Sequence, residues 1–147
     1  MTFDLADRGI YGFATSEHLR FADVDANGHV NNGAFIELLE NARVSYLRRI
    51  VRSGLPRFRL VIGRIEADFK RQMFFPGTAT ACARLIEVHS RKVVIGQALF
   101  DGEMQCTAVQ KVIMVSLNEE THRSTPFDGA VRAALEKLAA SKDGLPA

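Results

Sequence analysis

The sequence predicts an α+β fold in which one long helix lies against an antiparallel sheet of about five strands. A sustained helical period runs over residues 32–52, and a short extended stretch precedes it at 15–22. After the helix the period changes to that of strands, with turn residues between the apolar segments. The length of 147 residues suits one domain spanning 1–147, since neither an internal repeat nor a linker interrupts the chain.

The helix is expected to run from Asn32, as its N-cap, to about Arg52, with Gly54 and Pro56 marking its end. Its polar residues form one narrow strip, and apolar residues cover most of the remaining circumference, so we expect it to be largely enclosed. The strip consists of Glu37, Asn41, Ser45, Arg48 and Arg52. Glu40 and Arg43 fall inside the apolar arc, where a partly buried ion pair is the natural interpretation.

Four segments after the helix are predicted to be strands because they are rich in β-branched or alternating residues: 58–69, 78–88, 93–100 and 103–115. Phe75-Pro76-Gly77 separates two of them, and Asp101-Gly102 predicts a two-residue hairpin with positive φ at both positions. The alternation slips at Ala108-Val109, which we interpret as a bulge. Asp128 is expected to cap a second helix reaching about Ala140, with Val131, Leu135 and Leu138 as its apolar stripe.

Composition narrows the function classes. A formal net charge of +2 does not favour nucleic acid or an anionic membrane surface as a partner. The sequence shows neither a secretion signal nor an apolar run long enough to span a membrane. Cys82 and Cys106 lack metal-binding spacing and are expected to be buried free thiols, which suits the reducing cytoplasm.

Residues 20–36 place Asp, Asn, His and Gly side chains directly before the long helix. The amides at a helix N-terminus can polarise a carbonyl oxygen, and a carboxylate one turn upstream can act as nucleophile or base, which suits acyl transfer. The same segment imitates a calcium loop, but its twelfth position is Ala34 instead of Glu. His18, His89 and His122 lack ligand spacing and there is no GxSxG motif, so neither a metal site nor a serine nucleophile is predicted.

Four motifs together resemble the hot-dog fold thioesterases of the 4-hydroxybenzoyl-CoA thioesterase and bacterial acyl-CoA thioesterase group. They are Asp23-Val24-Asp25-Ala26-Asn27-Gly28-His29-Val30-Asn31-Asn32, Glu40-Asn41-Ala42-Arg43, Phe75-Pro76-Gly77 and Arg123-Ser124-Thr125-Pro126. The resemblance implies a hot-dog fold, in which an antiparallel sheet of about five strands wraps around the long central helix.

The resemblance also implies roles for individual residues. Asp25 would be the catalytic carboxylate, as nucleophile or as base for water, and the backbone N–H nearest Asn32 would polarise the thioester oxygen. His29 could orient Asp25 or water, or only stabilise the loop. Asn31 and Gly33 are expected to contact the substrate. Coenzyme A phosphates would meet basic residues after a strand, for which Arg91 and Lys92 fit best, although a solvated basic turn is an equal interpretation.

We therefore expect an acyl-CoA thioesterase that releases a free acid and CoA without a metal or organic cofactor. Two alternatives stay open: a thioesterase acting on acyl carrier protein, and a catalytically silent acyl-CoA-binding protein on the same fold. Exposed strand edges predict a homodimer, or a homotetramer built from two dimers.

Overall fold

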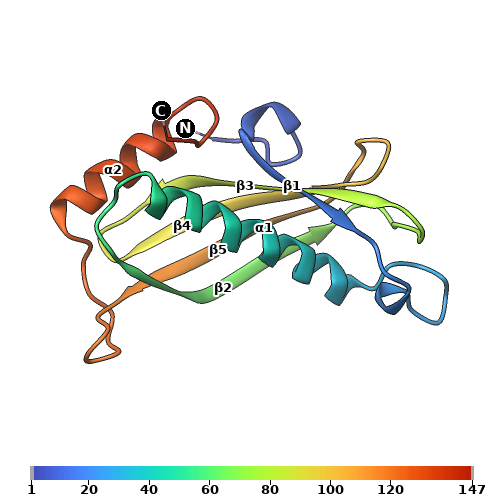
Figure 1. The fold of residues 1–147 in the computed structure, drawn as a ribbon, viewed down its shortest axis with the longest axis horizontal. Helices are drawn as coiled ribbons and strands as arrows, with labels where there is room; N and C mark the ends of the chain where they lie inside the picture. The colour runs from blue at the N-terminus through green and yellow to red at the C-terminus, as the bar shows by residue number, and fades with distance from the viewer. Residues whose placement is uncertain (1, 147) are drawn as a thin grey trace.

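A five-stranded antiparallel sheet carries one long helix on one face, in the spatial order β1-β3-β4-β5-β2 (Figure 1). The computed structural model describes residues 2–146. In chain order the elements are β1 (Phe13–His18), α1 (Asn32–Arg52), β2 (Arg59–Phe69), β3 (Thr78–Val88), β4 (Lys92–Phe100), β5 (Cys106–Leu117) and α2 (Gly129–Ala140). The predicted fold class is confirmed, and sequence periodicity located every one of these elements to within a few residues.

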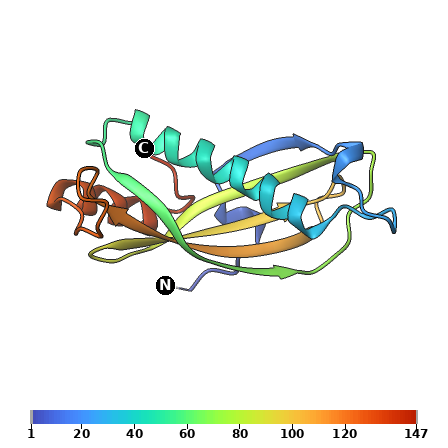
Figure 2. The same ribbon diagram turned by 90° about the horizontal axis from the view of Figure 1, so that it is seen from below.

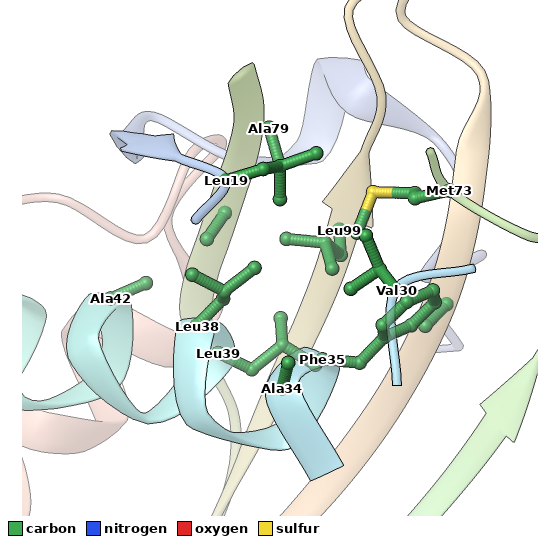
Figure 3. Packing of buried hydrophobic residues seen from close by; sticks show 12 residues of the cluster. Leu19, Val30, Ala34, Phe35, Leu38, Leu39, Ala42, Met73, Ala79 and Leu99 are labelled. Carbon is green, nitrogen blue, oxygen red and sulfur yellow. The ribbon is translucent and has the colours of Figure 1, made fainter. Parts of the chain in front are cut away.

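Packing of α1 across the sheet creates most of the hydrophobic core (Figure 2). Phe35, Leu38 and Leu39 from the first half of the helix meet small residues of the strands, including Ala79 (Figure 3). Ala81 and Ala108 belong to the same cluster. Small strand residues let the helix lie close to the sheet, so large helix side chains fill the space between them. Tyr46 and Ile50 from the second half pack in a cluster with Val131, Leu135 and Leu138, the predicted stripe of α2.

One prediction about α1 is corrected and one is confirmed. Val44 and Val51 remain 39% and 40% exposed, so the helix is less enclosed than its apolar arc suggests. The predicted partly buried ion pair is present, because Oε1 of the exposed Glu40 lies 3.9 Å from Nη2 of the buried Arg43. The Arg43 guanidinium is also bound by the sheet, since its Nη1 donates to Oε1 of the buried Gln97 at 3.2 Å.

Two connections also differ from the prediction. Asp101-Gly102 does not form a two-residue hairpin, because the connection runs over residues 101–105 and the positive φ falls on Met104. The Asp101 carboxylate accepts from the amides of Glu103 and Gln105, which stabilises the wider turn. The bulge lies at Thr107, because the register passes from Leu99 opposite Ala108 to Phe100 opposite Cys106.

Both cysteines are free thiols, but only Cys82 is fully buried, whereas Cys106 is half-buried. Burial raises the pKa of Cys82 to about 11, so this thiol stays protonated and unreactive at neutral pH. Within residues 2–146, no helix is long and apolar enough to cross a membrane.

The fully buried guanidinium of Arg84 holds the C-terminal segment against β3. It donates to the carbonyls of Ile10, Ala139, Ser141 and Lys142 at 2.8–3.1 Å. Because all four carbonyls would lose a donor at once, removing the guanidinium should greatly lower the free energy of unfolding.

We expect Arg84→Met to lower the free energy of unfolding by at least about 2 kcal/mol and to expose residues 139–146 to proteases. Urea denaturation and limited proteolysis measure the two effects. Arg132→Met, which removes an exposed pair with Glu136, is the control and should cost less than about 0.5 kcal/mol. Equal stability of the two variants would show that Arg84 does not anchor this segment.

Candidate active site

The loop before α1 is a tight hairpin closed by its own backbone. Val24 and Val30 form an antiparallel bridge, and the Asp25 amide donates to the His29 carbonyl at 2.8 Å. Gly28 turns the chain with φ +81°, a conformation that residues with a Cβ rarely adopt. The side chains of Asp25 and His29 are therefore presented next to the start of the helix.

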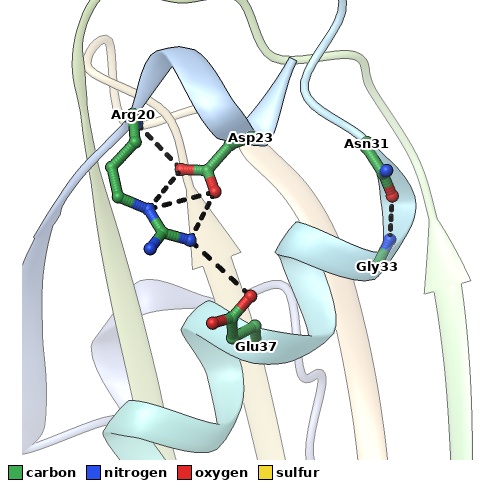
Figure 4. Close-up of polar contacts among 5 residues, drawn as sticks. All are labelled: Arg20, Asp23, Asn31, Gly33 and Glu37. Atoms are coloured by element: carbon green, nitrogen blue, oxygen red, sulfur yellow. Dashed lines mark hydrogen bonds and ion pairs between the residues drawn. The ribbon is translucent and has the colours of Figure 1, made fainter. Parts of the chain in front are cut away.

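An ion pair between the exposed Arg20 and the buried carboxylate of Asp23 anchors this hairpin to the protein (Figure 4). The Asp23 side chain is 3% exposed and accepts from the guanidinium of Arg20 at 2.7 Å and from the Arg20 amide at 2.8 Å. Arg20 Nη2 also lies 3.7 Å from a Glu37 carboxylate oxygen on α1. The bond to the Arg20 side chain holds the pKa of Asp23 below its usual range, and these contacts give Asp23 a loop-holding role.

The Asp25 carboxylate has one oxygen bound and one free. Its Oδ1 accepts from the amides of Asn27 at 2.9 Å and His29 at 3.1 Å, as in an Asx turn. No described residue donates to Oδ2, and the side chain is exposed. One oxygen thus fixes the orientation of the carboxylate while the other is available for chemistry.

The N-terminus of α1 offers one free amide beside this carboxylate. The N-cap is Asn31 instead of the predicted Asn32: its side chain accepts from the Gly33 amide at 2.6 Å, and its carbonyl accepts from Ala34 and Phe35. A Cβ on Gly33 would meet Asn31 Oδ1 at 3.0 Å, so glycine permits this close cap. Among the amides of residues 32–35, only that of Asn32 has no acceptor within the described chain, and it carries the positive end of the helix dipole.

A pocket of about 610 Å³ brings these groups together. The loop and the helix start contribute Asp25, Asn27, His29, Val30, Asn31 and Asn32 to its lining. The last residue of β2 and the three residues after it contribute Phe69, Lys70, Arg71 and Gln72. The rings of Phe35 and Phe69 lie 5.7 Å apart and give the pocket its apolar part. Its volume and mixed lining are typical of small-molecule sites.

The pocket unites some of the predicted site residues and separates others. Gly33 adjoins the pocket through the Asn31 cap but does not line it. Arg91 and Lys92 lie at the β3–β4 turn, at the other end of the sheet from the loop (Figure 1), where Arg91 donates to the Ser124 carbonyl at 2.8 Å. Within one chain they cannot share a pocket with Asp25.

Sequence reasoning missed Lys70, Arg71 and Gln72, which reach the pocket only because β2 pairs with β5 and ends beside the loop. Their one sequence signal is two adjacent cations directly after a strand. Beside these residues, Phe69 lines the pocket, Met73 belongs to the core, and Phe74 packs its ring 5.3 Å from that of His29.

The profile of the Thioesterase-like superfamily matches residues 19–135. Solved structures share the hot-dog fold. A predicted thioesterase from Bacillus stearothermophilus is 22% identical, with a TM-score of 0.75 over 92% of this chain and 98% of that chain. A thioesterase from Thermus thermophilus, complexed with coenzyme A and Zn, is 24% identical, with a TM-score of 0.73 over 85% of this chain and 98% of that chain. Among curated proteins, none matches the sequence.

Stability should depend on pH through Asp23. Because the pKa of Asp23 is lowered in the folded state, its ionised form stabilises the fold above the unfolded pKa of about 4 and this contribution is lost as the pH falls. Asp23→Asn should therefore destabilise the protein at pH 7, and the difference from wild type should shrink below about pH 4.

Urea denaturation across this pH range measures the effect. Asp68→Asn, which removes an exposed carboxylate outside the ion pairs of residues 2–146, is the control and should keep the wild-type profile. A difference between Asp23→Asn and wild type that stays constant with pH would mean that the ion pair with Arg20 contributes nothing.

Proposed function

The chain belongs to the thioesterase-like superfamily and is a thioester hydrolase; we propose that its substrates are acyl-CoA thioesters, which it cleaves at Asp25. The observation that carries the proposal is the presence of a free carboxylate oxygen and a free helix N-terminal amide in one pocket. A base or nucleophile beside an oxyanion site is what acyl transfer requires.

In the proposed reaction the thioester oxygen accepts from the Asn32 amide, which stabilises the negative charge that develops during attack. Asp25 either removes a proton from water that attacks the carbonyl carbon, or attacks this carbon itself to form an anhydride that water then cleaves. In both routes the carbon–sulfur bond breaks and CoA leaves as a thiolate, which takes up a proton released from the reacting water. The backbone of His29, bonded to Asp25 Oδ1, orients the carboxylate.

Two observations support CoA as the carrier. The pocket is lined by cations as well as by Asp25, and the similar thioesterase from Thermus thermophilus is complexed with coenzyme A. Acyl carrier protein remains the alternative carrier. A silent acyl-CoA-binding protein is less well supported, because pure binding needs neither the free Asp25 oxygen nor the free Asn32 amide.

A homodimer, itself able to pair into a tetramer, is part of the proposal. β2 is an edge strand of eleven residues whose outer side pairs with nothing in the described chain. Ile62, Ile65 and Phe69 on this strand are 38–44% exposed, and Val44 and Val51 continue the apolar surface onto α1. Such an edge invites pairing with a second copy.

A second copy would also give Arg91 and Lys92 a way to reach a site. Because they lie far from Asp25 in their own chain (Figure 1), they can bind CoA phosphates only at the partner's pocket. The free thiols of Cys82 and Cys106 support our proposal of a cytoplasmic location.

Asp25→Asn tests the catalytic assignment. The amide oxygen of Asn can still accept from the amides of Asn27 and His29, so the turn should survive while the charge is lost. We expect kcat to fall at least about 100-fold with folding and acyl-CoA binding retained.

Asp101→Asn is a matched control, because Asp101 Oδ1 accepts from the amides two and four residues later in the same way as Asp25. This variant should keep near wild-type turnover. If Asp25→Asn also keeps it, or loses activity only by unfolding, Asp25 is a turn residue and the assignment fails.

The double variant Ile62→Lys/Ile65→Lys tests the assembly. Charges on the open edge of β2 should block pairing, so the wild type should sediment as a dimer or tetramer at micromolar concentration and the variant as a monomer. Arg64→Lys/Glu66→Asp, which preserves the charges of an exposed ion pair on the same strand, should leave the assembly intact. A folded, active wild-type monomer would contradict the proposal.

A further inference from the structure

Residues 69–72 form a wall of the active-site pocket that is fixed on both sides. The amides of Lys70 and Arg71 both donate to the Thr107 carbonyl, at 2.8 and 3.2 Å, where β5 carries its bulge. Immediately beyond them, the Val30 amide donates to the Met73 carbonyl at 2.9 Å. Bulges commonly redirect side chains beside active sites. This one holds the residues after β2, and the Met73 carbonyl ties the same segment to the loop that carries Asp25.

The pocket has an excess of unpaired positive charge. Asp25 is the only acidic residue in its lining, whereas Lys70 and Arg71 are both cations. Neither cation forms a side-chain hydrogen bond or ion pair within residues 2–146. By contrast, Arg64 on the same strand is paired with Glu66, and Arg20 on the loop is paired with Asp23.

Arg71 is the better suited of the two cations to bind phosphate. Both Lys70 and Arg71 are exposed and line the pocket. A guanidinium presents a planar fork of donors that matches phosphate oxygens.

We propose that Arg71, assisted by Lys70, binds the phosphate groups at the far end of the pantetheine arm while the thioester lies at Asp25. The inference rests on the proposed function, because phosphorylated pantetheine is the part that CoA and acyl carrier protein have in common. In CoA this phosphate is one half of a diphosphate and the ribose carries a further phosphate, so CoA gains more from these cations than a carrier protein does. This pocket thus binds phosphate in the same protomer that supplies Asp25.

The contact should act on binding more than on chemistry. A phosphate far from the reacting carbon keeps the same charge in the ground and transition states, so losing its partner raises KM and leaves kcat nearly unchanged. We expect Arg71→Ala to raise KM for acyl-CoA about tenfold, the loss typical of one charge-assisted hydrogen bond. Arg71→Lys, which retains the charge, should recover part of the affinity.

The experiment compares the same acyl group on CoA, on acyl carrier protein and on phosphate-free pantetheine, with wild type, Arg71→Ala and Arg71→Lys. Arg59→Ala is the control, because Arg59 is an exposed cation at the opposite end of β2 without an ion pair among the described residues. Arg59→Ala should leave every KM unchanged. For wild type, added salt should raise KM for acyl-CoA but not for acyl-pantetheine.

If Arg71→Ala raises KM for acyl-CoA alone, the result supports the proposal with CoA as the carrier. If it raises KM for both acyl-CoA and the acylated carrier protein, the result supports binding of the phosphate that the two carriers have in common. Equal KM increases for acyl-CoA and acyl-pantetheine would overturn it, because Arg71 would then bind something other than phosphate. An unchanged KM in Arg71→Ala, with an increase in Arg91→Ala, would overturn it as well and assign the phosphates to the β3–β4 turn.

Direct binding of CoA, measured by calorimetry, separates this inference from the proposed function. If the wild type hydrolyses no thioester yet binds CoA, and Arg71→Ala weakens that binding about tenfold, the catalytic proposal fails and the phosphate site stands. If wild type hydrolyses acyl-CoA and Arg71→Ala binds CoA as tightly as wild type does, the phosphate site fails and the catalytic proposal stands.

Discussion

The ion pair between Arg20 and the buried carboxylate of Asp23 is the interaction on which the site depends. The carboxylate fixes the start of the loop, and the Asp23 carbonyl accepts from the Asn31 amide at 2.8 Å, which fixes its end. Asn31 in turn caps α1 and leaves only the Asn32 amide free among the first amides of the helix in the described chain. A buried anion without a partner is costly, so loss of Arg20 would displace the loop and the helix cap together.

Most of the fold was predictable because it follows from local periodicity. The bounds of α1 and β3 agree with the sequence pattern, since long periodic segments outweigh the preferences of single residues. Turn details were not predictable in the same way. Asp101-Gly102 has the composition of a two-residue hairpin, but the connection runs over residues 101–105 and is closed by the Asp101 carboxylate, and this depends on the register between β4 and β5.

The site was predictable where it is contiguous in sequence. Asp25, His29 and Asn32 lie within one loop and one helix start, so their proximity follows from the chain itself. Lys70 and Arg71 are brought there by pairing of strands far apart in the sequence, which composition does not reveal. Arg91 and Lys92 show the opposite case, because their residue type suits phosphate but they lie at the other end of the sheet from Asp25 within one chain.

In the proposed reaction the carboxylate of Asp25 combines a structural and a chemical role. Its bound oxygen closes the Asx turn and its free oxygen faces no donor from the described residues, so one residue would both shape the loop and supply the reactive group. The apolar part of the pocket, between Phe35 and Phe69, would then determine which acyl groups place their carbonyl at the helix start. Binding alone does not require this arrangement, whereas hydrolysis does.

The most direct test is therefore turnover on a panel of short, long, branched and aromatic acyl-CoAs, followed by the thiol that is released. We predict that at least one acyl-CoA is hydrolysed with thiol and free acid formed in equal amounts, and that the rate depends on the acyl group. Binding of acyl-CoAs without release of thiol from any of them would contradict the proposed hydrolysis and would identify the protein as a silent binder.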